Sequence, residues 1–159
     1  MNPFVYNFLL AFCWAAMTGD FSLGGLVTGL VFGFFALWIV QPLVGMDRFY
    51  FLRVWRISRL TAYFFWELFL SSVKVAADVL RPVPRNTPRI ITMPLDVKTD
   101  MEILTLTNLI SLTPGTLSVD VSEDRSELIV HAMFADDPEA EIANLKSGME
   151  RMVLEAFHP

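Results

Sequence analysis

The sequence predicts a membrane α-helical hairpin, then an amphipathic helix, and last a small α+β domain of two layers in the order βαββα. The first observation behind this is the absence of charge in residues 1–19 and 21–46. Each run approaches or exceeds the roughly 20 residues that a helix needs to cross a bilayer. The second observation is a division of charge, because residues 1–89 carry eight Lys/Arg and four Asp/Glu, whereas residues 90–159 carry four and thirteen.

Composition excludes several classes of protein. Hydrophobic residues make up 54% of the chain and charged residues only 18%, against about 25% charged in an ordinary soluble domain. One cysteine, Cys13, excludes an internal disulfide, and we expect it to be a buried, inert thiol. Two distant histidines predict no metal site, and the acidic second half argues against nucleic acid as a partner. Phosphate-binding and hydrolase motifs are missing from the sequence, which therefore predicts neither an enzyme nor a cofactor.

Residues 1–46 are predicted to form two transmembrane helices, near 3–19 and 22–42, joined by a tight turn at Thr18-Gly19-Asp20. A link this short requires an antiparallel hairpin. The second helix has a small residue at every fourth position, which allows another helix to approach closely. This predicts a packing face for assembly formed by Gly25, Gly29 and Gly33. The alternative is that glycine is simply common in membrane helices.

Residues 47–80 are interpreted as a basic loop followed by an amphipathic or third membrane helix. Arginines cluster at 47–59 and at 81–89, and the positive-inside rule places both clusters in the cytoplasm. A single crossing by residues 60–80 would put one cluster on the wrong side. We therefore favour an amphipathic helix, roughly 49–80, along the cytoplasmic membrane face or against partner subunits, with a third span as the alternative.

Ionisable residues near the membrane are candidates for an ion path. They are Asp20, Glu67, Lys74 and Asp78. The competing interpretation is a polar stripe on an interfacial helix, in which Lys74 and Asp78 form an i, i+4 surface pair.

Residues 81–89 contain three prolines and predict an extended linker that ends at a cytoplasmic α+β domain, 90–159. The domain begins with a strand, and Thr99 and Glu102 then form a capping box at the start of a helix. A hairpin whose first strand turns Leu117, Val119 and Val121 inward precedes the last helix. The predicted bounds are 90–97 for the first strand, about 112 for the end of the first helix, 116–122 and 128–134 for the hairpin, and 136–157 for the last helix.

A turn joins the first helix of this domain to the next strand. Pro114 fixes φ and Gly115 permits a positive φ, so the pair fits the central positions of a type II turn. Thr113 and Thr116 can bond to the backbone on either side. From the residues alone, this is a well-formed turn.

The sequence resembles the E-type subunits of the multisubunit Mrp-type (also called Mnh or Pha) monovalent cation/proton antiporters of bacteria. The resemblance covers essentially the whole chain. The segments that carry it are Trp14–Gly19, Gly24–Gly29, Val79–Pro82, Pro94–Asp100, Asn108–Thr116, Val119–Val121 and Val130–Ala132. It implies a hetero-oligomer of six or seven subunits that exchanges cytoplasmic Na+ or K+ for external H+. It further implies a multi-pass protein of the bacterial inner (plasma) membrane that supports pH homeostasis.

Three functions remain open from the sequence. The first is an accessory subunit that uses the glycine face, the amphipathic helix and the Thr113–Thr116 turn for assembly with the other subunits. The second is a subunit that lines part of the cation path through its ionisable residues. The third is a stand-alone membrane-anchored binding module. A free-standing enzyme is not among them, because the sequence lacks a catalytic constellation.

Overall fold

A computed structural model describes residues 3–44, 49–83 and 86–158 of the chain. The chain forms two compact units, residues 1–54 and 55–159, and each is described by itself. Arg48 and Arg85, which belong to the two arginine clusters, lie outside the described residues.

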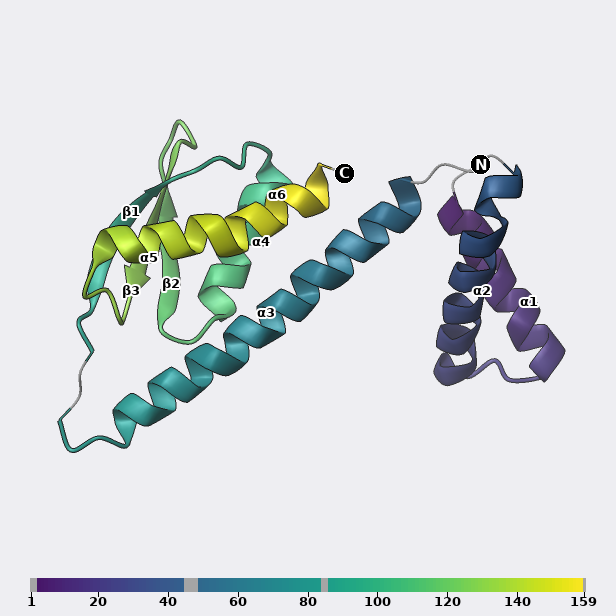
Figure 1. Cartoon of the computed structure of the whole chain (residues 1–159), viewed down its shortest axis with the longest axis horizontal. Helices are drawn as coiled ribbons and strands as arrows, with labels where there is room; N and C mark the ends of the chain where they lie inside the picture. Colours follow the sequence, from purple (N-terminus) through teal and green to yellow (C-terminus); the bar gives the residue numbers. More distant parts are fainter. Residues whose placement is uncertain (1–2, 45–48, 84–85, 159) are drawn as a thin grey trace. The chain divides into compact units, whose positions relative to one another are not determined.

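The first unit contains the hairpin of helices α1 (Pro3–Thr18) and α2 (Leu23–Val44), shown in Figure 1. Gly19 in the connecting turn has φ +71°, a conformation that glycine adopts without steric cost. Both helices are strongly apolar. By length and composition, residues 23–43 could cross a membrane, while α1 is a shorter apolar helix of 16 residues. Only four residues join α1 to α2, and Gly29 of α2 packs on Ala11 of α1, so the predicted antiparallel hairpin is present in the structure.

Helix α3 (Phe49–Val79) runs without interruption for 31 residues, close to the predicted range of 49–80. By length and composition it is also a candidate span. Most of α3 belongs to the second unit, and its Leu60 joins the buried core of the C-terminal domain. The two compact units thus divide at Val54 and Trp55, whereas the sequence places a domain boundary in the proline-rich segment 81–89.

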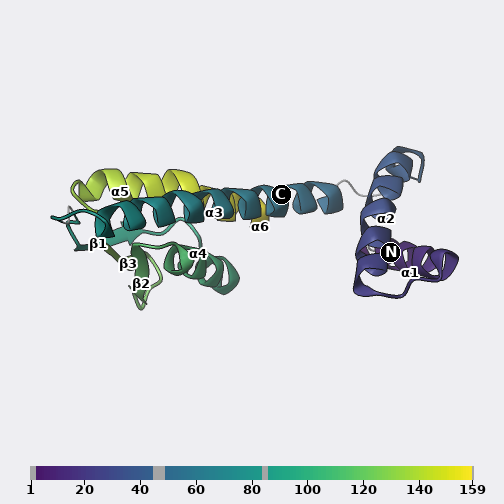
Figure 2. The same cartoon turned by 90° about the horizontal axis from the view of Figure 1, so that it is seen from below.

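The C-terminal domain has the element order that the sequence predicts. Its elements are β1 (Arg89–Pro94), α4 (Asp100–Leu112), β2 (Thr116–Val121), β3 (Glu127–Ala132), α5 (Pro138–Leu145), the π-helical segment η1 (Lys146–Glu150) and α6 (Arg151–Phe157). The antiparallel sheet has the order β1-β3-β2, so β3 is central. The last three elements follow one another as a single long helical arm, and α3 passes beside them in both views (Figures 1 and 2).

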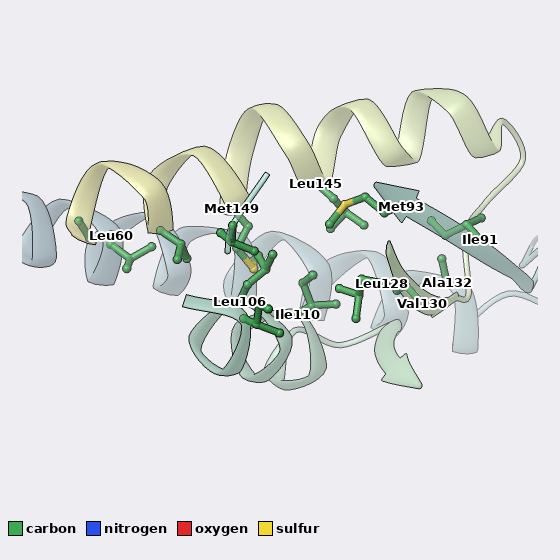
Figure 3. Packing of buried hydrophobic residues seen from close by; sticks show 14 of the residues in the cluster. Leu60, Ile91, Met93, Leu106, Ile110, Leu128, Val130, Ala132, Leu145 and Met149 are labelled. Atoms are coloured by element: carbon green, nitrogen blue, oxygen red, sulfur yellow. The ribbon is translucent and has the colours of Figure 1, made fainter. Parts of the chain in front are cut away.

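The core lies on one face of this sheet (Figure 3). Met93, Leu128 and Val130 are fully buried there. From α4 the core receives Leu106 and Ile110. The last helical arm adds Leu145, Met149 and Val153, with Ile142 and Met152 partly buried beside them. The opposite sheet face remains more open.

Two sequence predictions about side-chain placement are wrong. Leu117 and Val119 are 53% and 54% exposed, because Ser118 occupies the inner face of β2. Ser118 donates its Oγ to the carbonyl of Thr107 and its N–H to Ser111 Oγ, and a β-bulge follows between Ser118 and Asp120. Cys13 is exposed on α1 rather than buried.

Two buried carboxylates hold the segment after β1. Glu150 accepts hydrogen bonds from the N–H groups of Asp96 (2.6 Å) and Val97 (3.3 Å). Glu102 accepts from the N–H of Thr99 (3.0 Å), while Thr99 Oγ1 accepts from Glu102 N–H, which confirms the predicted capping box. Burial disfavours the Glu102 charge, but these backbone donors and nearby His158 outweigh it and lower the pKa of Glu102.

Candidate functional site

The predicted glycine face packs within the chain. A Cβ built on Gly29 would lie 2.9 Å from the Cα and carbonyl oxygen of Ala11. Gly33 lies against Asn7, and Gly25 against the backbone and carboxylate of Asp20. Each later glycine along α2 contacts an earlier residue of the chain, as expected for antiparallel helices. The helix partner that the glycine spacing predicts is therefore α1 of the same protein.

A polar contact joins this hairpin to the start of α3. Asn7 is buried, and its Nδ2 donates to the Tyr50 hydroxyl at 3.1 Å. Phe34 of α2 packs against both Tyr50 and Phe51, with ring centres 6.1 and 5.3 Å apart. Since a buried amide without a partner is costly in an apolar setting, this bond favours one position for Tyr50.

The turn after α4 has the predicted geometry. Thr116 N–H donates to the Thr113 carbonyl at 3.2 Å, and Gly115 has φ +93°. Thr113 Oγ1 donates to the Leu109 carbonyl, and Thr116 Oγ1 donates to that of Ile110. The hydroxyls thereby bond to carbonyls in the last turn of α4, where the Ile110 carbonyl also accepts the Thr113 N–H.

This turn also lies against α3. A Cβ on Gly115 would be in ordinary contact with Val75 of α3 and with the ring of Phe134, 3.6 Å from each. The neighbour that the structure gives to the turn is consequently a helix of the same chain.

A polar cavity of about 580 Å³ lies between α3, this turn and the last helical arm. It brings together residues that are far apart in the sequence. Its polar lining consists of Tyr63, Glu67, Ser71, Lys74, Thr113, Thr116, Glu141, Asn144 and Ser147. Two of the four predicted ion-path residues, Glu67 and Lys74, are thus placed at one cavity. Asp20 lies in the exposed hairpin turn, and Asp78 is buried on α3 but is not part of the cavity lining.

Charge in the cavity is mixed. Burial raises the pKa of Glu141, with the Lys74 ammonium opposing this rise and the Glu67 carboxylate adding to it. The Lys74 ammonium lies 4.5 Å from the centre of the Phe134 ring, within cation–π range. The cavity is therefore lined by two carboxylates, of Glu67 and Glu141, and by the ammonium of Lys74. These side chains can bond to polar or charged groups that enter the cavity.

The π-helical segment shapes one wall of the cavity. At Gly148 a Cβ would overlap the hydroxyl oxygen of Tyr63, so any other residue requires the tyrosine side chain to move. π-Helical turns inside α-helices often occur at functional sites. Tyr63, Glu141 and Gly148 were not predicted from the sequence, because no local pattern signals a π-helical turn or a contact between α3 and the last helical arm.

Two arginines of the first basic cluster bind the end of the chain. Arg56 donates to the carbonyl oxygens of Glu155 (2.9 Å) and His158 (2.6 Å). Arg59 pairs with the Glu155 carboxylate at 3.1 Å. Arginines near helix C-termini satisfy free carbonyls and complement the helix dipole. Across the described parts of the chain, no group of three or more His, Cys, Asp or Glu side chains is placed to hold a metal ion.

Comparison with known proteins decides the family. The family model described as "Na+/H+ ion antiporter subunit" matches residues 7–156. The chain belongs to this family. It is 34% identical to the E1 subunit of the Na(+)/H(+) antiporter of Staphylococcus haemolyticus, covering 95% of this chain and 94% of the relative. To the corresponding E-type subunit of the Na(+)/H(+) antiporter of Alkalihalophilus pseudofirmus it is 36% identical, covering 94% of each.

One solved structure agrees with this family assignment, and a second shares the fold. A chain of the Mrp complex from Dietzia sp. matches with a TM-score of 0.51 and 32% identity, covering 65% of this antiporter-family chain and 97% of that chain. A chain of the membrane-bound sulfane sulfur reductase, an archaeal respiratory membrane complex, matches with a TM-score of 0.56 over 96% of this chain. At 22% identity, the second match shows a shared fold only.

Proposed function

We propose that this protein is an accessory, structural subunit of a multisubunit monovalent cation/proton antiporter, needed for the assembly and activity of the complex. The observation that carries the proposal is the similarity to proteins named as E-type subunits of Na(+)/H(+) antiporters along nearly their whole length. The proposed complex exchanges cytoplasmic Na+ or K+ for external H+. Its other subunits are the partners of this chain.

The exposed surface of the domain supports a role inside a complex. Large apolar side chains are exposed on α4 at Leu104 and Leu112, and on the open sheet face at Ile90, Leu117 and Val119. Their exposed fractions lie between 53% and 68%. Exposed apolar surface of this kind marks sites of protein interaction.

Purification tests the proposal directly. We expect the tagged full chain, extracted in mild detergent, to copurify with the large antiporter subunits at a fixed ratio. Deleting the chain should remove both the assembled complex and cation-driven proton exchange in everted vesicles. Recovery of the chain alone from membranes in which exchange persists after its deletion would overturn the proposal.

The proposed topology places the C-terminal domain and both arginine clusters in the cytoplasm, because positively charged segments are retained there. Single cysteines at Asn86 and Ser126, introduced after Cys13→Ser, provide the test, since both positions are accessible in the structure. We expect impermeant thiol reagents to label them in everted vesicles but not in intact cells. Labelling in intact cells would reverse the topology.

A second function is favoured by the polar cavity. There Glu67, which lines the cavity together with Glu141 and Lys74, is the candidate contact for the transported cation. If so, Glu67→Gln should abolish exchange while the complex still assembles in normal amount. Glu139→Gln is the matched control, because this carboxylate lies on α5 but is exposed and outside the cavity lining. Normal exchange in both variants would leave only the structural role.

A further inference from the structure

Helix α3 presents an uncharged aromatic face to its surroundings. Trp55, Phe65, Trp66, Phe69 and Val73 are 52% to 67% exposed. Their spacing places them on one side of the helix; we call this side the outer face. Among the exposed residues from 61 to 73, none is charged; the exposed Arg59 and Lys74 flank this stretch, and Arg59 pairs with Glu155. A helix that is exposed to water carries charged residues on its exposed side. The exposed side of α3 is apolar instead, so it is unlike the surface of a helix in water.

Two hydroxyl groups beside the outer face are bonded to the backbone of the helix itself. Thr61 Oγ1 donates to the Ile57 carbonyl at 2.9 Å, and Ser72 Oγ donates to the Leu68 carbonyl at 2.6 Å. A hydroxyl that is already bonded within the helix can be buried against acyl chains without losing a hydrogen bond to water. Thr61 and Ser72 are both bonded in this way.

The opposite side of α3 binds the C-terminal domain. Arg56 bonds to the end of the last helical arm, Leu60 enters the core, and Val75 meets the turn at Gly115. Residues 56–75 cover about 29 Å at 1.5 Å per residue, which is nearly the thickness of a bilayer core. An upright α3 would therefore carry the charged α5–α6 arm into the hydrocarbon, where ionised groups are disfavoured.

We propose that α3 lies in the plane of the membrane surface, with its outer face in the boundary between lipid headgroups and acyl chains and the domain on its other side. The partner of this face is thus the lipid bilayer, even though the length and apolar content of α3 would suffice for a span. Trp and Phe on one face are typical of interfacial helices. The inference goes beyond the proposed function and rests only on its membrane location.

Depth-dependent fluorescence quenching tests the orientation. Full chains with one tryptophan each, at Trp55, at Trp66 or through Val73→Trp, are placed in nanodiscs with lipids brominated at different acyl positions. The other tryptophans, including Trp14 and Trp38, are changed to Phe. Trp55 and Val73 are eighteen residues apart, five full turns, and so share one side of the helix. A helix in the plane gives three equal, shallow depths, with the shallow bromines quenching most.

An upright helix gives a different result. Trp55 and Trp66 would then differ in depth by about 16 Å, and at least one of the three tryptophans would be quenched most by the deepest bromines. This result overturns the proposal. Quenching by aqueous iodide instead of brominated lipid would overturn it as well, because the outer face would then meet water.

Photocrosslinking in the assembled complex tests whether lipid or protein covers the face. Benzoylphenylalanine at Phe65 or Phe69 should form adducts with phospholipid in native membranes, detected by mass spectrometry. Leu104 on α4, which is 55% exposed on the domain, is the control and should give no lipid adduct. Crosslinks from both α3 positions to another subunit, without lipid adducts, would refute the proposal. Failure of copurification would instead refute the proposed function and leave the lipid adducts unchanged.

Discussion

The contact between Gly29 and Ala11 makes a sharp prediction about the hairpin. In Gly29→Ala, the new methyl group would lie 2.9 Å from backbone atoms of Ala11 and 3.0 Å from Trp14 Cβ, where ordinary contact begins at 3.4 Å. Backbone atoms cannot rotate away, so the two helices must separate locally. Overpacking of this kind costs about 1–3 kcal/mol, which corresponds to a roughly 5- to 150-fold loss in the folded-to-unfolded ratio.

Gly24→Ala is the matched control on the same helix. Its methyl group would meet only Ser22 Oγ, at an ordinary 3.6 Å. Both variants exchange glycine for alanine on α2, so a larger loss of stability in Gly29→Ala reports the clash. Thermal unfolding of the full chain in detergent, followed by tryptophan fluorescence, measures it, because Trp14 stacks on Phe32 next to the contact with a centroid distance of 4.7 Å.

We expect Gly29→Ala to unfold at a clearly lower temperature than Gly24→Ala. Equal midpoints for the two variants would refute the argument from close packing. A Gly29→Ala chain that is normal in detergent but absent from the complex on native gels would show that the glycine face packs on another subunit instead.

Four further changes test the domain. Gly115→Ala should cost about 1–2 kcal/mol, because its φ of +93° is unfavourable for alanine, and should lower the urea midpoint of the full chain. Glu150→Ala removes the acceptor of the Asp96 and Val97 N–H groups and leaves the buried Val97 N–H unpaired, at about 1–3 kcal/mol, and hydrogen exchange at these two amides should accelerate. Gly148→Ala should displace the Tyr63 hydroxyl from the π-helical segment, seen as a shift of the Tyr63 ring resonances in nuclear magnetic resonance spectra relative to wild type. The lowered pKa of Glu102 means that its charge stabilises the fold at pH values above its ordinary pKa of 4.5. This stabilisation is lost as pH falls through the lower pKa of the folded state. In Glu102→Gln, the unfolding free energy should therefore fall less over this acidic range. Loss of stability as pH falls, unchanged in that variant, would contradict the last prediction.

Local sequence determined much of this fold. Runs without charge predict the membrane hairpin, because a single ionised group in a span is costly. The capping box at Thr99 and the turn at Thr113–Thr116 were predictable for a different reason, since each forms from hydrogen bonds between residues a few positions apart. In each case the interaction is contained within the segment that shows the pattern.

Tertiary structure decided the rest. Spacing alone predicts that Gly29 meets a helix, but which helix depends on how the chain folds back. The orientation of β2 followed from Ser118, whose two bonds to α4 and neighbouring bulge outweigh the apolar alternation of Leu117 and Val119. The polar cavity joins α3 to the last helical arm across more than sixty residues of sequence, so Glu67 and Glu141 show no shared local signal. Contacts between distant segments depend on side-chain shape and partner geometry, and neither is encoded in a local period of charge or hydropathy.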